Sequence, residues 1–137
     1  MKRVPRGELS YDADDGLTYF EGEPFTGIAR GEFIDGTLES EAEFREGLLW
    51  GHSRAWHGNG ALAEEADYFQ DVKHGVSREW SPEGVLQEET ECEYGIVLSK
   101  RKWDEKGTLV EEYRLKETDS AYERLLQSRK VYGPSSA

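Results

Sequence analysis

The chain has 137 residues, with 17 Lys and Arg against 29 Asp and Glu, which gives a formal net charge of -12. A chain of this length is expected to form one domain, residues 1–137, with a modest core. The negative charge argues against nucleic acid or an anionic membrane as ligand and favours a basic partner, although the same charge can also serve solubility alone.

The remaining composition narrows the class of protein further. Hydrophobic residues make up 36% of the chain, and its single cysteine excludes both an internal disulfide and a multi-cysteine metal site. No apolar run approaches the ~20 residues of a membrane-spanning helix, and the first residues lack the apolar core of a signal peptide. These features predict a soluble cytoplasmic protein.

In chain order, the first segment is the acidic, turn-rich stretch SYDADDG at residues 10–16, which predicts either a capping strand or a loop. A degenerate copy of a repeat follows it. Its members lie 24 residues before their counterparts in the next unit, and Glu32 stands where the later units have tryptophan. The members of this copy are Gly27, Arg30, Gly36 and Leu38.

A dodecamer then occurs three times, as RAWHGNGALAEE at 54–65, REWSPEGVLQEE at 78–89 and RKWDEKGTLVEE at 101–112. Glycine-rich turn signals between short aromatic and branched segments predict one β-hairpin per copy. We expect the repeated residues to pack hairpins against each other, because a repeat unit cannot bury its apolar face alone. They are Arg54, Trp56, Leu62, Arg78, Trp80, Leu86, Arg101, Trp103 and Leu109.

A three-residue turn in the first of these hairpins would place Trp56 opposite Leu62 and Arg54 opposite Glu64. The same register would pair Arg78 with Glu88 and Arg101 with Glu111. Because side chains alternate along a strand, the other face would then carry an acidic strip suited to a cationic partner, or else a solvated surface. The strip, our candidate partner-binding site, consists of Glu65, Asp67, Glu79, Glu89, Glu91 and Glu112.

After the repeats the hydrophobic period changes to that of a helix. Tyr122, Leu125, Leu126 and Arg129 recur at spacings of three and four, and Ser120 with Glu123 has the spacing of a capping box. We expect a short helix within residues 118–131 that covers the open end of the last hairpin. Residues 133–137 are expected to form a flexible tail.

No pattern in the chain indicates catalysis or a cofactor. His52 and His57 would face opposite sides of one strand, and His74 would lie in the next loop, so a metal site is not supported. Cys92 occupies the position of Phe44 and Tyr68 in earlier units, which indicates a small apolar filler rather than a nucleophile. We therefore expect no enzyme, no metal and no cofactor.

The lead GLTYFEGEPFTG from Gly16, followed by units with a W-x-x-x-G-x-L pattern, resembles the MORN-variant repeat proteins of the YwqK antitoxin type. The resemblance covers residues 16–113, and Leu98 departs from it because Gly51 and Gly75 hold this position in earlier units. It implies a mainly β fold, an elongated single-layer twisted antiparallel sheet of hairpins with a short C-terminal helix.

For function, the resemblance implies a non-enzymatic antitoxin or immunity protein that neutralises a bacterial toxin with a basic surface by direct binding. The alternative is a MORN-type structural or targeting scaffold, including one at a membrane, although the acidic charge argues against anionic lipid. A homodimer through the sheet edges is also compatible with an open sheet.

Overall fold

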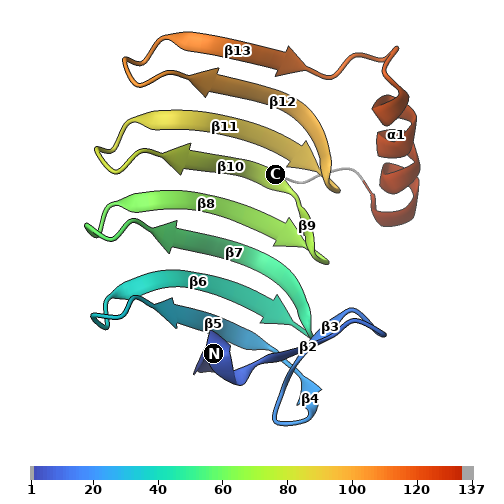
Figure 1. Cartoon of the computed structure of the whole chain (residues 1–137). Coiled ribbons are helices and arrows are strands. Elements are labelled where there is room, and N and C mark those ends of the chain that lie inside the picture. Colours follow the sequence, from blue (N-terminus) through green and yellow to red (C-terminus); the bar gives the residue numbers. More distant parts are fainter. Residues whose placement is uncertain (1, 134–137) are drawn as a thin grey trace.

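The computed structural model describes residues 2–133 and shows one long sheet with a helix beside one end of its strands (Figure 1). The elements in chain order are β1 (Arg3–Pro5), η1 (Arg6–Glu8), β2 (Ser10–Asp12), β3 (Leu17–Phe20), β4 (Glu23–Pro24), β5 (Gly27–Glu32), β6 (Leu38–Arg45), β7 (Leu48–Trp56), β8 (Leu62–Phe69), β9 (Val72–Lys73), β10 (Gly75–Trp80), β11 (Leu86–Glu93), β12 (Ile96–Trp103), β13 (Leu109–Arg114) and α1 (Ser120–Tyr132).

The main sheet has the strand order β1-β5-β6-β7-β8-β10-β11-β12-β13, and the two-residue strand β9 pairs only with β8. Apart from β9, each strand from β5 onward pairs with the next one along the chain. This arrangement confirms the predicted mainly β fold of stacked hairpins. Two features differ from the prediction. β1 pairs parallel with β5, which makes the sheet mixed, and β2, β3 and β4 form a separate small sheet that contains part of the acidic lead.

Two kinds of turn join the strands, one kind at each end of the sheet. At the end near α1 the turns are Glu46–Gly47, Gln70–Asp71 and Tyr94–Gly95, and both residues of each have positive φ, as a two-residue type I′ hairpin requires. At the other end a side chain caps the loop, as where the amide of Ala61 donates to Asn59 Oδ1 at 2.9 Å. Local turn chemistry thus fixes both ends of each hairpin.

Next to each of the longer loops, the pairing of the two strands shifts in register. Trp56 lies opposite Leu62, as predicted, but the register shifts between Ala55 and Trp56, and Arg54 therefore lies opposite Glu65 and not Glu64. The same shift recurs in the later hairpins, where the predicted Arg78–Glu88 and Arg101–Glu111 pairs are replaced by Arg78–Glu89 and Arg101–Glu112. A β-bulge, one extra residue in one strand, explains the difference.

The sheet is thinly covered and leaves much surface exposed. Its accessible area is 8873 Å², whereas a compact monomer of this size exposes about 7,200 Å². A buried cluster of Val4, Phe25 and Ala29 lies at the N-terminal end of the sheet, and Leu125 of α1 is buried near the other end. The repeated tryptophans are only half-buried.

Helix α1 begins one residue earlier than a cap at Ser120 would place it. Asp119 is the N-cap residue, Ser120 is the first helical residue, and the expected capping box with Glu123 does not form. Instead Asp119 Oδ2 accepts a hydrogen bond from the amide of Lys116 at 2.9 Å and fixes the turn before the helix. The predicted tail at 133–137 lies outside the described residues except for Gly133.

Candidate functional site

The register of the main sheet aligns arginine and glutamate alternately across one face, from β5 to β13. Each arginine lies directly opposite a glutamate on the neighbouring strand, and each glutamate between two strands lies opposite arginines on both sides. We call this row the charge ladder and its side of the sheet the ladder face. Its members are Arg30, Glu41, Arg54, Glu65, Arg78, Glu89, Arg101 and Glu112.

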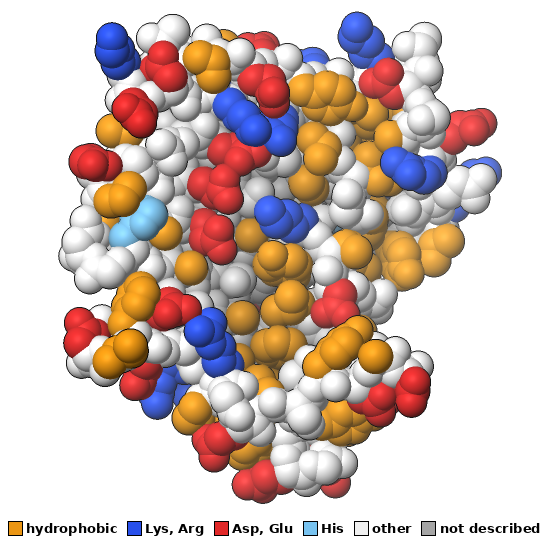
Figure 2. Space-filling view, viewed as in Figure 1, with side chains coloured by type: hydrophobic (Ala, Val, Ile, Leu, Met, Phe, Trp, Pro, Cys, Tyr) orange, Lys and Arg blue, Asp and Glu red, His pale blue; other side chains and the backbone are white. Residues whose placement is uncertain are grey.

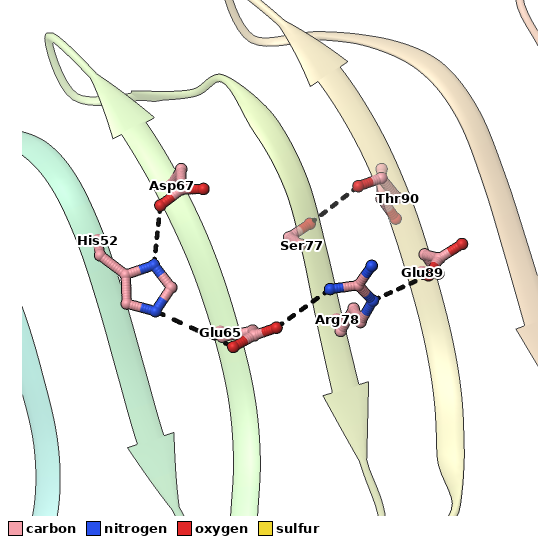
Figure 3. Close-up of polar contacts among 7 residues, drawn as sticks. All are labelled: His52, Glu65, Asp67, Ser77, Arg78, Glu89 and Thr90. Carbon is pink, nitrogen blue, oxygen red and sulfur yellow. Dashed lines mark hydrogen bonds and ion pairs between the residues drawn. The ribbon is translucent and has the colours of Figure 1, made fainter. Parts of the chain in front are cut away.

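The centre of the charge ladder is also where its ion pairs are closest (Figure 3). Arg78 Nε lies 2.9 Å from Glu89 Oε2, and Arg78 Nη1 lies 3.2 Å from Glu65 Oε1. The hydrogen bond to Glu89, with a smaller contribution from Glu65, raises the pKa of the Arg78 guanidinium above its ordinary value. At the edge strand the contact is looser, with 4.0 Å between Arg101 Nε and Glu112 Oε2.

The six residues of the predicted acidic strip do not all lie on one face of the sheet. Glu65, Glu89 and Glu112 belong to the ladder and lie opposite arginines. Asp67 lies opposite His52, and its Oδ1 is 2.8 Å from His52 Nδ1 (Figure 3). Glu91 lies on the same face. The sixth member, Glu79, lies on the opposite face, so the six carboxylates do not form one strip.

The opposite face carries a different acidic group, the acidic row of Glu64, Glu79 and Glu88. Glu79 lies directly opposite Glu64 on β8 and directly opposite Glu88 on β11. Like charges directly opposite each other on adjacent strands destabilise a sheet. The row ends where Lys102 lies opposite Glu88, and Lys100 Nζ lies 3.1 Å from Glu88 Oε1. Figure 2 shows acidic side chains gathered over the middle strands.

Proton binding in the acidic row responds to this crowding. A hydrogen bond between the Glu79 and Glu88 side chains raises the pKa of the Glu79 carboxyl, and burial and the charge of Glu88 raise it further. The same hydrogen bond lowers the pKa of Glu88, and Lys100 lowers it further. Protonation of this pair therefore favours Glu79, and a cationic group near Glu79 would stabilise the ionised form of its carboxyl.

Small side chains border the acidic row and leave room beside it. Ser53, Ala66, Ser77 and Thr90 line a shallow hollow of about 70 Å³ together with Glu64, Glu79 and Glu88. Ser77 is buried, and its hydroxyl donates to the backbone oxygen of Thr90 at 3.5 Å (Figure 3). Tyr68 and Lys73 also line the hollow, and the charge of Lys73 acts to lower the pKa of Glu79, so a cationic side chain from a partner would share this space with Lys73.

The sequence reasoning missed Glu64 and Glu88 as members of a candidate site. It placed both on the face of the arginines, because it assumed a hairpin without an irregularity. The signal for the correct register was the glycine that ends each loop. Gly60 has φ +88° and Gly84 has φ +88°, a left-handed conformation that is typical of loops followed by a β-bulge.

The three histidines each have a separate structural contact. His52 pairs with Asp67, His57 Nε2 lies 2.8 Å from the backbone oxygen of Trp80, and His74 Nδ1 accepts from the amide of Tyr94 at 2.9 Å. Within residues 2–133 no three His, Cys, Asp or Glu side chains are grouped to hold a metal ion. Cys92 is buried, and burial raises the pKa of its thiol, which makes it a poor nucleophile.

Hydrophobic side chains gather between the acidic row and α1 (Figure 2). One hollow of about 640 Å³ is lined by residues of β12, β13 and α1, among them Ile96, Val97, Tyr113 and Ala121. Beside it, Val72 and Cys92 line a second hollow of about 390 Å³. This apolar area lies next to the carboxylates and extends the surface that a protein partner could cover.

Comparisons of the chain with protein-family models, with curated proteins and with solved structures find no match. Among the described residues, no helix has both the length and the apolar character needed to cross a membrane.

Proposed function

We propose that this chain is a non-enzymatic protein-binding module, acting as an antitoxin or immunity protein that holds a toxin with a basic surface. The observation that carries the proposal is the acidic row. Three carboxylates on adjacent strands lie directly opposite one another, an arrangement that costs the fold stability and gains most from an external positive charge. The net charge of -12 would attract the same class of partner over a longer range.

The position of the row supports a contact through the sheet surface. Glu64 and Glu79 are exposed, and small side chains line part of the hollow beside them. Interfaces concentrate their binding energy in a few anchors surrounded by contacts that exclude water. The apolar area beside the row would supply such contacts. Glu65, Glu89 and Glu112 of the ladder face already lie opposite arginines within the chain, whereas Glu64 and Glu79 of the row have no lysine or arginine opposite them.

The proposal is tested by mixing the purified chain with the product of the adjacent gene and measuring affinity by calorimetry. Replacing Glu64, Glu79 and Glu88 together by Gln should weaken binding by about tenfold or more, and the loss should shrink at high salt. A matched control replaces the exposed Glu8, Glu83 and Glu117 by Gln, which changes the net charge equally at other places.

If both triple variants lose the same affinity, only the net charge of the chain matters for binding. That result would refute the role of the acidic row as the contact. Absence of any complex with the neighbouring product would count against the antitoxin function itself. Co-sedimentation of the chain with anionic vesicles would instead support the alternative, a structural or targeting scaffold at a membrane, which the acidic surface disfavours.

A further inference from the structure

One edge of the main sheet is open. β13 is the outermost strand in Figure 1, and within residues 2–133 no strand pairs with its outer side. All of its residues are exposed, including Val110 at 62% and Tyr113 at 39%. The opposite edge is different, because it ends in the short strand β1, whose Pro5 has no amide to donate.

The backbone of β13 offers hydrogen-bonding groups to a further strand. The amide of Leu115 donates to the oxygen of Leu98 at 2.8 Å, so Leu115 directs its backbone groups toward β12. In an antiparallel strand the direction alternates from residue to residue. Tyr113 therefore also faces β12, and the amides and carbonyls of Glu112 and Arg114 point away from the sheet.

The same two residues carry complementary charges at the end of the charge ladder. Glu112 is half-exposed and has only the 4.0 Å contact with Arg101, while Arg114 lies opposite the uncharged Ser99. Glu112 and Arg114 are two positions apart, so their side chains lie on the same face of the sheet. The ladder thus stops at a glutamate that lacks an arginine on its outer side.

We propose that β13 pairs antiparallel with β13 of a second copy of the chain, around a two-fold axis at Tyr113. In such a pairing, residues of one face must lie opposite residues of the same face. An axis at Glu111 or Glu112 would place identical carboxylates opposite each other, and an axis at Arg114 would place two guanidinium groups opposite each other. Among pairs formed within Leu109–Arg114, only the axis at Tyr113 places opposite charges opposite each other.

In this register Glu112 of each copy lies opposite Arg114 of the other, and the charge ladder continues across the axis. The outward backbone groups of these residues form hydrogen-bonded pairs, in which two residues exchange both of their bonds. Tyr113 lies opposite Tyr113 of the second copy, a cross-strand aromatic pair. This pairing uses neither the acidic row nor any partner toxin and is therefore independent of the proposed function.

Sedimentation of charge-swapped variants tests the pairing. The unsubstituted chain should dimerise reversibly, and Glu112→Arg and Arg114→Glu should each weaken the dimer by about tenfold or more, because each creates two like-charged pairs. The double variant should restore the dimer. Restoration is specific to the pairing, because the double variant still places a guanidinium opposite Arg101.

A disulfide test fixes the register. Tyr113→Cys should form a disulfide-linked dimer under mild oxidation, because the two-fold axis brings its two copies face to face. Glu111→Cys is the matched control and should not cross-link, since the register places it opposite Leu115. The unsubstituted chain, with only the buried Cys92, provides the background.

Three results would overturn the proposal. A chain that remains monomeric up to about 1 mM would leave the β13 edge without a second copy on it. A double variant as weak as the single variants would show that Glu112 and Arg114 do not lie opposite each other across the axis. Cross-linking of Glu111→Cys that equals or exceeds that of Tyr113→Cys would place the axis elsewhere.

Discussion

The attachment of α1 to the sheet depends on an ion pair with one buried partner. Arg129 Nε lies 2.5 Å from Glu93 Oε2, and Arg129 Nη2 lies 3.1 Å from Glu93 Oε1. The Glu93 side chain is only 5% exposed, whereas that of Arg129 is 37% exposed. Arg129→Ala would therefore leave a nearly buried carboxylate without its cation, which is the costly way to break such a pair.

The size of the effect follows from this asymmetry. Removing one partner of a fully buried pair costs about 3–5 kcal/mol, but water already reaches the guanidinium here, so we expect about 2 kcal/mol. For a chain of this length that loss corresponds to a melting temperature lower by about 7 °C. The loss should be smaller when Glu93→Gln is added, because a neutral amide is easier to leave buried.

Thermal unfolding followed by circular dichroism measures the change, and hydrogen exchange of residues 92–98 shows whether the hairpin beneath α1 opens first. Arg124→Ala is the matched control, since Arg124 is exposed on the same helix. Equal melting temperatures for Arg129→Ala and Arg124→Ala would refute the reasoning. They would mean that Leu125 and the stacked rings of Tyr94 and Tyr132 hold α1 without the ion pair.

Two further predictions concern the sheet itself. Trp80→Ala should destabilise the chain by about 1–3 kcal/mol in urea denaturation, less than a fully buried tryptophan, because the ring is half-buried; a loss above this range would show that the ring is a core residue. The raised pKa of Glu79 means that this carboxyl lowers stability as pH rises through its folded pKa. Glu79→Gln should therefore raise the melting temperature by about 2 °C at pH 8 and by little at pH 4, and an equal gain at both would contradict like-charge repulsion.

Local signals in the sequence were sufficient to predict the hairpins. The turn residues and the alternation of apolar positions specify each strand pair independently of the rest of the chain. The Trp56–Leu62 pair is confirmed, and Glu32 lies opposite Leu38 in the first unit, the position that tryptophan holds in the other hairpins. Helix α1 also has a local origin in its period of three and four.

The features that depend on the whole sheet could not be predicted in the same way. The parallel pairing of β1 with β5 joins segments that no repeat relates, and no pattern in residues 3–5 indicates it. The aromatic contacts of Phe69 with Tyr94 and Tyr132 join two neighbouring hairpins to α1, at ring-centroid distances of 5.7 and 5.2 Å. Such contacts depend on how hairpins stack, which single-unit reasoning does not address.

The β-bulge connects the scaffold to the candidate site. Each full unit has two consecutive glutamates, as in Glu64–Glu65 and Glu88–Glu89, and adjacent residues on a strand face opposite sides. We call each pair of consecutive glutamates a dyad. One glutamate of each dyad must therefore lie opposite the arginine, and the other must lie on the opposite face of the sheet. The extra residue in the hairpin decides which one does so, and in the structure the second glutamate joins the charge ladder.

The first glutamate of each dyad is then free of the repeat's own arginines. In the last dyad Glu111 lies opposite Lys102, which also lies opposite Glu88, so the two carboxylates of this face without a lysine or arginine opposite them are Glu64 on β8 and Glu79 on β10. If the bulge were absent, the first glutamates would enter the ladder, and the second ones would form the exposed row. The repeat thus pairs arginine with glutamate on one face of the sheet. On the other face, Lys102 of the final copy offsets the negative charge at that end of the row.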